Sequence, residues 1–429
     1  MKNIFSIKKS IVCMVAGLMI VMVGGTPFIG LENQTVYGTA EGSKSLSMAE
    51  RLADLDYLYT TIEENYPYLE VNKRLYGVDW LKTKDQYIQK VKACKSDEAF
   101  AQTIQSALGE LHNGHTHVLN RDYVIWMKEV YKNFKESGYW QGMLYDVLDQ
   151  PLVSQRYGIS KDTKVDNPLA QTSTETKRPA NVSIADIKKG EIAYIKINQM
   201  LSFWEMDGDR KTIDHYLEGV KKYPALVIDI RGNGGGDSRY WSEYLVPKLI
   251  AKPYETQFYS FFKDGKDINA FFKAAQVFKM PLVKDLNTNQ MKNLPKEVKK
   301  DFTYYGMSTL VVTPLKETIQ FKGKIYLLVD EGVYSSAEAF AMFAKHTGFA
   351  TLIGEKTGGD GLSSDPMLSV LPNSGLVIRY TKEMGTTVDG TCNEEHKTLP
   401  HYIIKNPDKA GTFSKDNCIQ KVIELEKKK

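Results

Sequence analysis

The spacing of hydrophobic residues changes from helical to strand-like near residue 184. Before this point, apolar residues recur at helical spacing in stretches that begin at Ser47, near Asp79 and near Ser96. The first stretch opens with a capping-box signature, Ser47-Met48-Ala49-Glu50, and ends at Pro67. The pattern therefore predicts a helical N-terminal lobe over residues 41–117.

Strand-like patterns dominate between residues 184 and 408. Apolar runs of strand length alternate there with helical stretches, and the clearest runs are residues 192–197, 225–230 and 324–329. Strands that alternate with helices are typical of βαβ units, whose strands run parallel. We therefore predict an α/β fold whose core, residues 184–408, contains a largely parallel sheet. An insertion is expected at about 252–320, and a C-terminal helix within 409–429.

Residues 118–183 fit neither pattern. Their first part is rich in aromatic residues, and their second part, from Ser154 onward, is polar and has no clear period. Polar segments without periodicity are typical of exposed connections. We interpret residues 118–183 as an aromatic and polar connection between the lobe and the core. A role as a lid over a site is an open alternative.

The first 40 residues have the pattern of an export signal. Lysines precede an apolar run at residues 11–25, and the small residues Gly38 and Ala40 precede the expected cleavage site. The apolar run is shorter than the ~20 residues that a membrane-spanning helix needs. We therefore predict a cleaved signal peptide and a secreted or extracytoplasmic protein. Retention of the segment as an anchor, with the protein at the cell surface, is the alternative.

Composition limits the classes of partner. The chain has 429 residues, 42% of them hydrophobic, which is enough for a large buried core. Its 56 basic and 52 acidic residues give a net charge of +4, and the basic residues are scattered, so we expect no nucleic-acid partner. Beyond the signal, Cys94, Cys392 and Cys418 are too few and too scattered for a disulfide scaffold or a zinc site.

Ser335 and Ser336 lie where a predicted strand gives way to a helix. Residues 324–329 have the pattern of a buried strand, Asp330-Glu331-Gly332 interrupts it, and apolar residues at helical spacing follow. At such a turn, unpaired helix amides can stabilise an anion, as an acyl-transfer nucleophile requires. Ser335 with Glu338 also matches a capping box, so a nucleophile and a helix cap both fit this position.

A glycine-rich loop, residues 231–236, follows the predicted strand at 225–230. Consecutive glycines let the backbone approach a ligand and point amide N–H groups at a negative centre. The loop lacks the Gly-Lys-Ser/Thr of a nucleotide-binding loop and the spacing of a dinucleotide fingerprint. We therefore favour an oxyanion or peptide-backbone site over a phosphate site, with a structural turn as the other alternative.

Two further segments contain candidate catalytic groups. His112, His115 and His117 are close in sequence, which fits a general base, a metal site or a solvated helix end. Glu394 and Glu395 form an acidic pair, and a carboxylate there could orient an imidazole, although acidic residues in loops are ordinarily just solvated. Neither segment decides between its alternatives by itself.

Together these motifs resemble the tail-specific, or C-terminal processing, serine peptidase family. The sequence VIDIRGNGGG is similar to the family's Asp-x-Arg-x-Asn-x-Gly-Gly strand and loop. The sequences SSAEAF and LIGEKTGG are similar to its Ser-Ala-x-Glu helix start and Gly-Glu-x-Thr-x-Gly turn. The resemblance implies a crotonase-like ββα spiral. It also implies that Ser335 is the nucleophile and that the Ser336 amide forms an oxyanion hole with Gly235 or Gly236.

The resemblance also distinguishes two branches by their catalytic base. The processing branch carries a lysine base at the position that Asp360 occupies here, so we do not expect a serine–lysine dyad. Asn113-Gly114-His115-Thr116 instead resembles the Asp-Gly-His-Thr motif of the tricorn-like branch, which implies that His115 is the base. That branch's orienting glutamate, counted back from a late proline, corresponds to Glu394, with Glu395 as the alternative.

We therefore expect an exported serine peptidase that acts on peptide or protein substrates through Ser335, His115 and Glu394. It resembles the tricorn-like and interphotoreceptor-retinoid-binding-protein-like branch without a PDZ domain, because residues 118–183 lack a carboxylate-binding loop. We expect no metal, no cofactor and no stable membrane partner. A non-catalytic ligand-binding protein on the same fold and an esterase-type acyl hydrolase are the alternatives.

Overall fold

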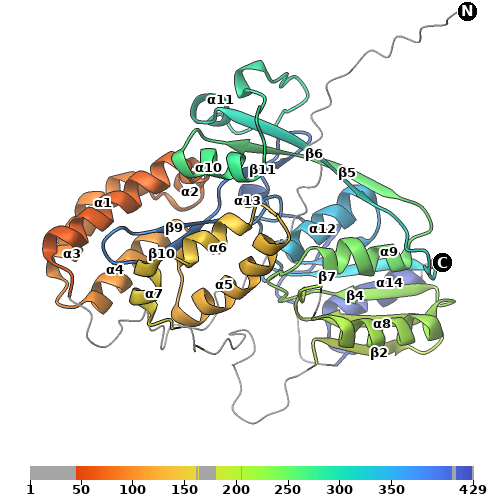
Figure 1. Cartoon of the computed structure of the whole chain (residues 1–429). Helices are drawn as coiled ribbons and strands as arrows, with labels where there is room; N and C mark the ends of the chain where they lie inside the picture. The colour runs from red at the N-terminus through yellow and green to blue at the C-terminus, as the bar shows by residue number, and fades with distance from the viewer. Residues whose placement is uncertain (1–44, 161–162, 164–179, 204, 408–411, 428–429) are drawn as a thin grey trace, which may run out of the picture.

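The computed structural model describes residues 45–160, 163, 180–203, 205–407 and 412–427. A helical lobe and an α/β core lie side by side, and an antiparallel sheet lies above them (Figure 1). The predicted signal peptide at residues 1–40, and much of the polar part of the predicted connection, lie outside the described residues.

The helical lobe positions the segment that carries His115. Its first helices are α1 (Met48–Asn65), α2 (Leu69–Tyr76), α3 (Lys84–Ala93) and α4 (Asp97–Gly109). The capping box predicted at the start of α1 is confirmed, because Ser47 Oγ accepts the Glu50 N–H at 3.3 Å and Glu50 Oε2 accepts the Ser47 N–H at 2.7 Å. Ile62 of α1 and Ile104 of α4 are fully buried in the lobe.

The aromatic segment after the lobe forms three helices: α5 (Arg121–Glu136), α6 (Gly142–Leu148) and α7 (Pro151–Tyr157). Val124, Met127, Tyr131 and Phe134 recur at helical spacing, and this apolar face of α5 is buried. It shares one core with the lobe and with a small sheet of β1 (His117–Val118), β10 (Val377–Tyr380) and β9 (Met367–Val370). Residues 121–157 therefore pack into the core instead of forming an exposed connection.

The central sheet confirms the predicted α/β fold with a largely parallel sheet. Its strands lie in the order β12 (Tyr402–Ile403), β8 (Thr351–Gly354), β7 (Lys324–Val329), β4 (Ala225–Asp229), β3 (Ile192–Ile197) and β2 (Val182–Lys188). All neighbouring strands pair in parallel except β2 with β3. The inner strands β3, β4 and β7 have short, nearly continuous apolar sequences, which suit strands that are buried on both faces.

Helices cover both faces of this sheet. On one face lie α8 (Asp207–Val220), the π-helix η3 (Tyr240–Leu245) with α9 (Val246–Leu249), and α12 (Ser336–Thr347). On the other face lies α14 (Asn417–Lys427), the predicted C-terminal helix. Alternate side chains of β3 divide between the two cores, with Ile195 in the first and Tyr194 in the second. Because β4 and β7 run parallel, their carboxyl ends lie at the same edge of the sheet, and the glycine loop and Ser335 follow these two ends.

The predicted insertion at 252–320 forms the antiparallel sheet in Figure 1. It contributes β5 (Tyr254–Phe262) and β6 (Tyr304–Val312), and β11 (Met384–Thr387) joins them in the order β11-β5-β6. Short helices α10 (Lys266–Ala274) and α11 (Val298–Asp301) lie between β5 and β6. Helix α13 (Asn393–His396) follows β11 and carries the acidic pair.

Two further expectations concern cysteines and membranes. Among the described residues, Cys94, Cys392 and Cys418 are free, so no disulfide links the two buried ones. A search of the same residues finds no helix with the length and apolar character that crossing a membrane requires.

Candidate active site

Ser335 sits on a strained turn at the start of α12. Its backbone has φ 57° and ψ −125°, a conformation that is costly for any residue except glycine and that is common at active sites. Its amide donates to the Gly359 carbonyl at 3.1 Å. Its side chain makes no capping hydrogen bond to α12, so the capping-box alternative is wrong here. Glu338 instead accepts hydrogen bonds from Asn393 and Thr398, both at 2.7 Å.

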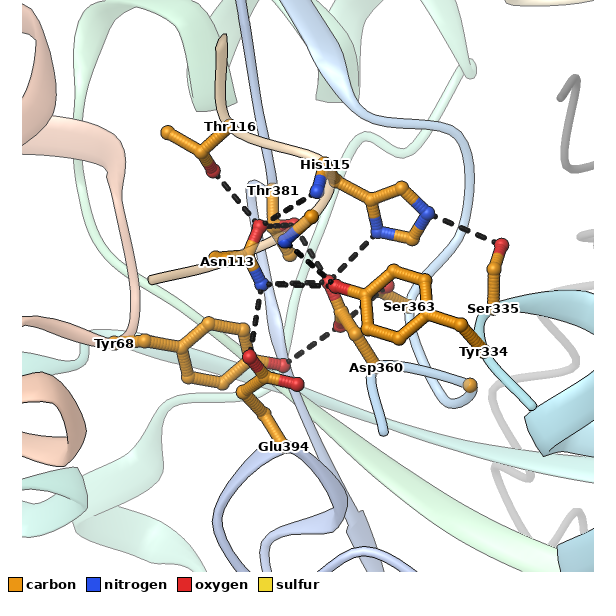
Figure 2. Close-up of polar contacts among 12 residues, drawn as sticks. Tyr68, Asn113, His115, Thr116, Tyr334, Ser335, Asp360, Ser363, Thr381 and Glu394 are labelled. Atoms are coloured by element: carbon orange, nitrogen blue, oxygen red, sulfur yellow. Dashed lines mark hydrogen bonds and ion pairs between the residues drawn. The ribbon is translucent and has the colours of Figure 1, made fainter. Parts of the chain in front are cut away.

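His115 lies beside Ser335 although the two residues are 220 positions apart in sequence (Figure 2). The distance from His115 Nε2 to Ser335 Oγ is 3.1 Å, and both side chains are fully buried. His115 follows α4, and its amide donates to Asn113 Oδ1 at 3.1 Å, which fixes the turn between the helix and β1. The structure therefore brings together the predicted nucleophile and the predicted base within hydrogen-bond reach.

The carboxylate beside His115 belongs to Asp360, not to Glu394. Asp360 Oδ2 lies 2.8 Å from His115 Nδ1, on the side of the ring opposite Ser335 (Figure 2). Its other hydrogen-bond donors are Tyr68 (3.1 Å), Asn113 (3.0 Å), Ser363 (2.9 Å) and Thr381 (2.8 Å). These donors hold both carboxylate oxygens, so the carboxylate has one defined direction.

The structure does not place Glu394 against His115, as the sequence led us to expect, and it does not place Glu395 there either. Glu394 Oε1 accepts from Asn113 Nδ2 at 3.1 Å, and Glu394 Oε2 pairs with Lys397 at 3.3 Å. Glu395 forms a two-point ion pair with Arg74 on α2. The physical reason is the turn at residues 359–360, whose φ angles of 102° and 48° direct the Asp360 side chain toward His115.

The electrostatics of the site favour a neutral histidine beside an ionised aspartate. Burial lowers the pKa of His115, Asp360 raises it, and Arg379 and Lys382 lower it again, so the pKa lies below its ordinary value. Burial by itself would raise the pKa of Asp360, but His115, Asn113 and Thr381 lower it below its ordinary value. A neutral imidazole can accept a proton from Ser335, and the anion can stabilise the imidazolium that forms.

These pKa shifts predict how activity depends on pH. Because protonated His115 cannot accept the Ser335 proton, kcat/KM should fall tenfold per unit as pH drops below the His115 pKa. Because that pKa is lowered, the midpoint should lie below the ordinary value of ~6.5. A pH profile of kcat/KM from 4 to 8, with protein stability followed in parallel, measures the midpoint. A midpoint above 6.5 would contradict this environment for His115.

The glycine loop approaches Ser335 and Ser336 closely. A Cβ atom placed on Gly235 would lie 2.8 Å from Ser335 Cβ and 2.9 Å from the Ser336 nitrogen. The Gly235 amide donates to Asn233 Oδ1 at 2.9 Å. Among the described residues, the amides of Gly236 and Ser336 make no hydrogen bond. Of the two glycines predicted for an oxyanion hole, Gly236 is therefore the one whose amide is available.

The contact between Gly235 and Ser335 can be tested with a matched pair of glycines. Gly235→Ala should lower kcat/KM by roughly 10²-fold, because its methyl group would displace the serine. Gly232→Ala is the control, since Gly232 also has a positive φ but no atom within 4 Å of its Cβ position. Both variants should lose stability through backbone strain, measured as Tm. Equal activities would show that the contact is unimportant.

The other two histidines have separate surroundings. His112 stacks on Tyr76 with ring centroids 4.0 Å apart, and its Nδ1 lies 3.0 Å from Asn72 Oδ1. His117 is in β1, where burial lowers its pKa to about 3. Within the residues that the structure describes, no three His, Cys, Asp or Glu side chains gather in a way that could hold a metal ion. In the described residues, the three histidines therefore do not gather into one site.

A polar groove of about 1070 Å³ lies next to this site. Its lining includes Met342 and His346 of α12, Gln257 of β5, and Lys397. Lys397 also covers Gly359, because a Cβ on Gly359 would lie 2.6 Å from Lys397 Cδ. Lys397 therefore lines the groove and also approaches Gly359, whose carbonyl accepts the Ser335 amide.

Comparison with known proteins identifies the family and the fold. The model of peptidase family S41 matches residues 191–404, which include Ser335, Asp360 and the glycine loop but not His115. A solved structure of a candidate peptidase from Parabacteroides merdae is 19% identical, with a TM-score of 0.54 over 89% of this chain and 97% of that one. Mature CPAF complexed with lactacystin is 13% identical, with a TM-score of 0.51 over 83% and 93%.

No curated protein sequence matches the chain. At such low identities, the two solved structures show a shared fold and nothing more. The family match, which spans about half of the chain, defines a serine peptidase. The chain belongs to peptidase family S41, and its predicted resemblance to the tail-specific serine peptidases is confirmed.

Proposed function

We propose that this serine peptidase is exported and that it hydrolyses peptide bonds with Ser335, His115 and Asp360 as its catalytic triad. One observation carries the triad: His115 lies 3.1 Å from Ser335 Oγ through Nε2 and 2.8 Å from Asp360 Oδ2 through Nδ1. This is the order of contacts that nucleophilic catalysis by serine requires. Membership of a peptidase family supports a peptide or protein substrate.

In the proposed reaction, His115 Nε2 takes the Ser335 proton while Ser335 Oγ attacks the scissile carbonyl. Asp360 accepts the hydrogen bond from Nδ1 and stabilises the imidazolium. The amides of Ser336 and Gly236 stabilise the oxyanion. His115 then gives its proton to the leaving amine, the C–N bond breaks, and an acyl-enzyme on Ser335 remains. A water molecule that loses its proton to His115 hydrolyses this ester and restores the serine.

Peptide cleavage tests the proposed function directly. The purified protein should cleave members of a diverse peptide mixture, and mass spectrometry should detect new termini that the Ser335→Ala variant does not produce. Turnover of simple esters without any peptide cleavage would favour an acyl hydrolase. Absence of turnover for both, with a folded protein, would favour the non-catalytic binding protein.

The proposal of export rests on the pattern of the first 40 residues. The protein recovered outside the cytoplasm should begin after Ala40, which N-terminal sequencing would establish. An intact N-terminus on membrane-bound protein would support the anchor instead.

A further inference from the structure

Asn113 is the most connected side chain of the site that is outside the proposed triad (Figure 2). Its buried amide group takes part in six hydrogen bonds. Asn113 Nδ2 donates to Asp360 Oδ2 (3.0 Å), Glu394 Oε1 (3.1 Å) and Tyr334 Oη (3.3 Å). Asn113 Oδ1 accepts from the His115 amide (3.1 Å), Thr116 Oγ1 (2.8 Å) and Thr381 Oγ1 (3.3 Å).

The Asn113 side chain therefore holds both members of the His115–Asp360 pair. Its oxygen fixes the backbone of His115, and its nitrogen fixes the carboxylate oxygen of Asp360 that faces the imidazole. These two bonds link the His115 backbone to the Asp360 carboxylate, which Tyr68, Ser363 and Thr381 also hold. A shift of either end would misplace His115 Nε2 relative to Ser335, and small misplacements of catalytic groups are expensive.

The same amide separates two buried carboxylates. Asp360 and Glu394 both accept from Asn113 Nδ2, and the two hydrogens of this neutral NH₂ group can serve both acceptors. An aspartate at position 113 would instead place a carboxylate oxygen, which only accepts, against the acceptor oxygens of Asp360 and Glu394. Two ionised carboxylates so close together in a buried site would repel, and burial together with Asp360 raises the pKa of Glu394 to about 8, so Glu394 is largely neutral at pH 7. The amide thus lets the second carboxylate remain in the site without contacting the imidazole.

We propose that Asn113 is a positioning residue of this peptidase, which aims Asp360 at His115 and keeps Glu394 apart from the imidazole. The inference rests on the proposed function, because it assumes that Ser335, His115 and Asp360 act together. It also accounts for two departures from the family motifs. Asn113 stands where the Asp-Gly-His-Thr motif has aspartate, and Asp360 stands where the processing branch has lysine, and these two residues are hydrogen-bonded to each other.

The charged groups around the site determine what a substitution should do. His115 faces Asp360, and the positive charges of Arg379 on β10 and of Lys382 lower its pKa. Tyr334 packs against the ring at 4.9 Å, and His117 follows along the chain. Glu394 faces Asp360, Asn113 and Lys397. A new negative charge at position 113 would add to Asp360 and would favour the protonated form of His115.

The test compares Asn113→Asp, Asn113→Ser and the unchanged protein as full chains. The probe is a fluorophosphonate, and the readout is the second-order rate constant of Ser335 labelling between pH 4 and 9. Asn113→Asp should move the midpoint of the acid limb to higher pH, by on the order of one pH unit, because the added negative charge raises the His115 pKa. Asn113→Ser adds no charge, so it should lower the plateau by roughly 10²-fold without moving the limb.

Asn72→Asp is the matched control. Asn72 is also a buried asparagine of the lobe, with hydrogen bonds to the Glu110 carbonyl and His112, and it contacts none of the proposed triad. It should lower Tm but leave both the limb and the plateau of labelling unchanged. A merely structural role for Asn113 would give the same result for Asn113 variants as for Asn72→Asp.

The outcomes separate this inference from the proposed function. If the unchanged protein does not label at Ser335, the proposed function itself fails. The positioning role is overturned if the unchanged protein labels normally and Asn113→Asp keeps the pH midpoint of its acid limb unchanged and its plateau rate within twofold. If Asn113→Asp does not fold, Asn113→Ser decides, since a plateau within twofold of the unchanged protein also overturns the role.

Discussion

His115→Gln should lower kcat by roughly 10⁶-fold, the largest loss that we expect from a single substitution outside the nucleophile. Glutamine can keep a hydrogen bond to Asp360, so the buried carboxylate retains a donor in place of Nδ1. An amide cannot accept the Ser335 proton, however, so the nucleophile loses its activation. The measurement is kcat for a peptide substrate, with circular dichroism and Tm to establish that the fold is kept.

His112→Gln is the matched control for this variant. His112 lies three residues earlier, stacks on Tyr76 and does not contact Ser335. It should retain kcat within about twofold, since substitutions that leave the catalytic contacts in place rarely change turnover. A His115→Gln variant that keeps more than a few per cent of the activity would remove His115 from the role of base.

Asp360→Asn should lower kcat by on the order of 10⁴-fold. The amide would present either a donor or a weaker acceptor to His115 Nδ1, so it would favour the wrong tautomer and would not stabilise the imidazolium. The matched control is Glu394→Gln, which removes the carboxylate that sequence reasoning assigned to the same role. Because Glu394 contacts Asn113 and Lys397 and not His115, Glu394→Gln should cost less than about tenfold.

The ratio of these two losses is the informative quantity. Burial raises the pKa of Glu394 to about 8, so this side chain is largely protonated at neutral pH and offers His115 little negative charge. The pKa of Asp360 is shifted in the opposite direction. If Glu394→Gln proved the more damaging substitution, the orienting carboxylate would be Glu394, and the direct contact of Asp360 would be of secondary importance.

Sequence patterns predicted the sheet because it follows from local rules, whereas the resemblance to the family was needed to favour a nucleophile over a helix cap at Ser335. The apolar runs at residues 225–230 and 324–329 correspond to β4 and β7, and the residues that follow them carry the glycine loop and Ser335. Only the resemblance to a family motif indicated His115 as the base, since nothing in the local sequence distinguishes it from His112 or His117. Its closeness to Ser335 depends on how the lobe packs against the core.

The third member of the proposed triad, Asp360, could not be predicted from the sequence in the same way. Counting along a motif led to Glu394, which lies one hydrogen-bonded residue, Asn113, away from Asp360. The position of Asp360 depends on a left-handed backbone at residues 359 and 360, which no periodic pattern reveals. The one available signal was that an ionisable residue occupied the position of the processing branch's lysine.

Two capping-box signatures show how context decides a local motif. Ser47 with Glu50 forms the box as predicted, because the Ser47 backbone is extended. Ser335 with Glu338 has the same spacing, but the left-handed backbone of Ser335 turns its side chain to His115, and Glu338 binds Asn393 and Thr398. The positive φ of Ser335 and its contact with His115 Nε2 are the structural features that distinguish it from an ordinary helix cap.

Covalent labelling with a fluorophosphonate tests the central claim most directly, because only an activated serine displaces the fluoride at an appreciable rate. Intact mass and peptide mapping should show a single adduct on Ser335 in the unchanged protein. Ser335→Ala should show none, and labelling of His115→Gln should be slower by several orders of magnitude. An adduct on Ser336, equal labelling of His115→Gln, or no adduct on the folded protein would contradict the proposed triad.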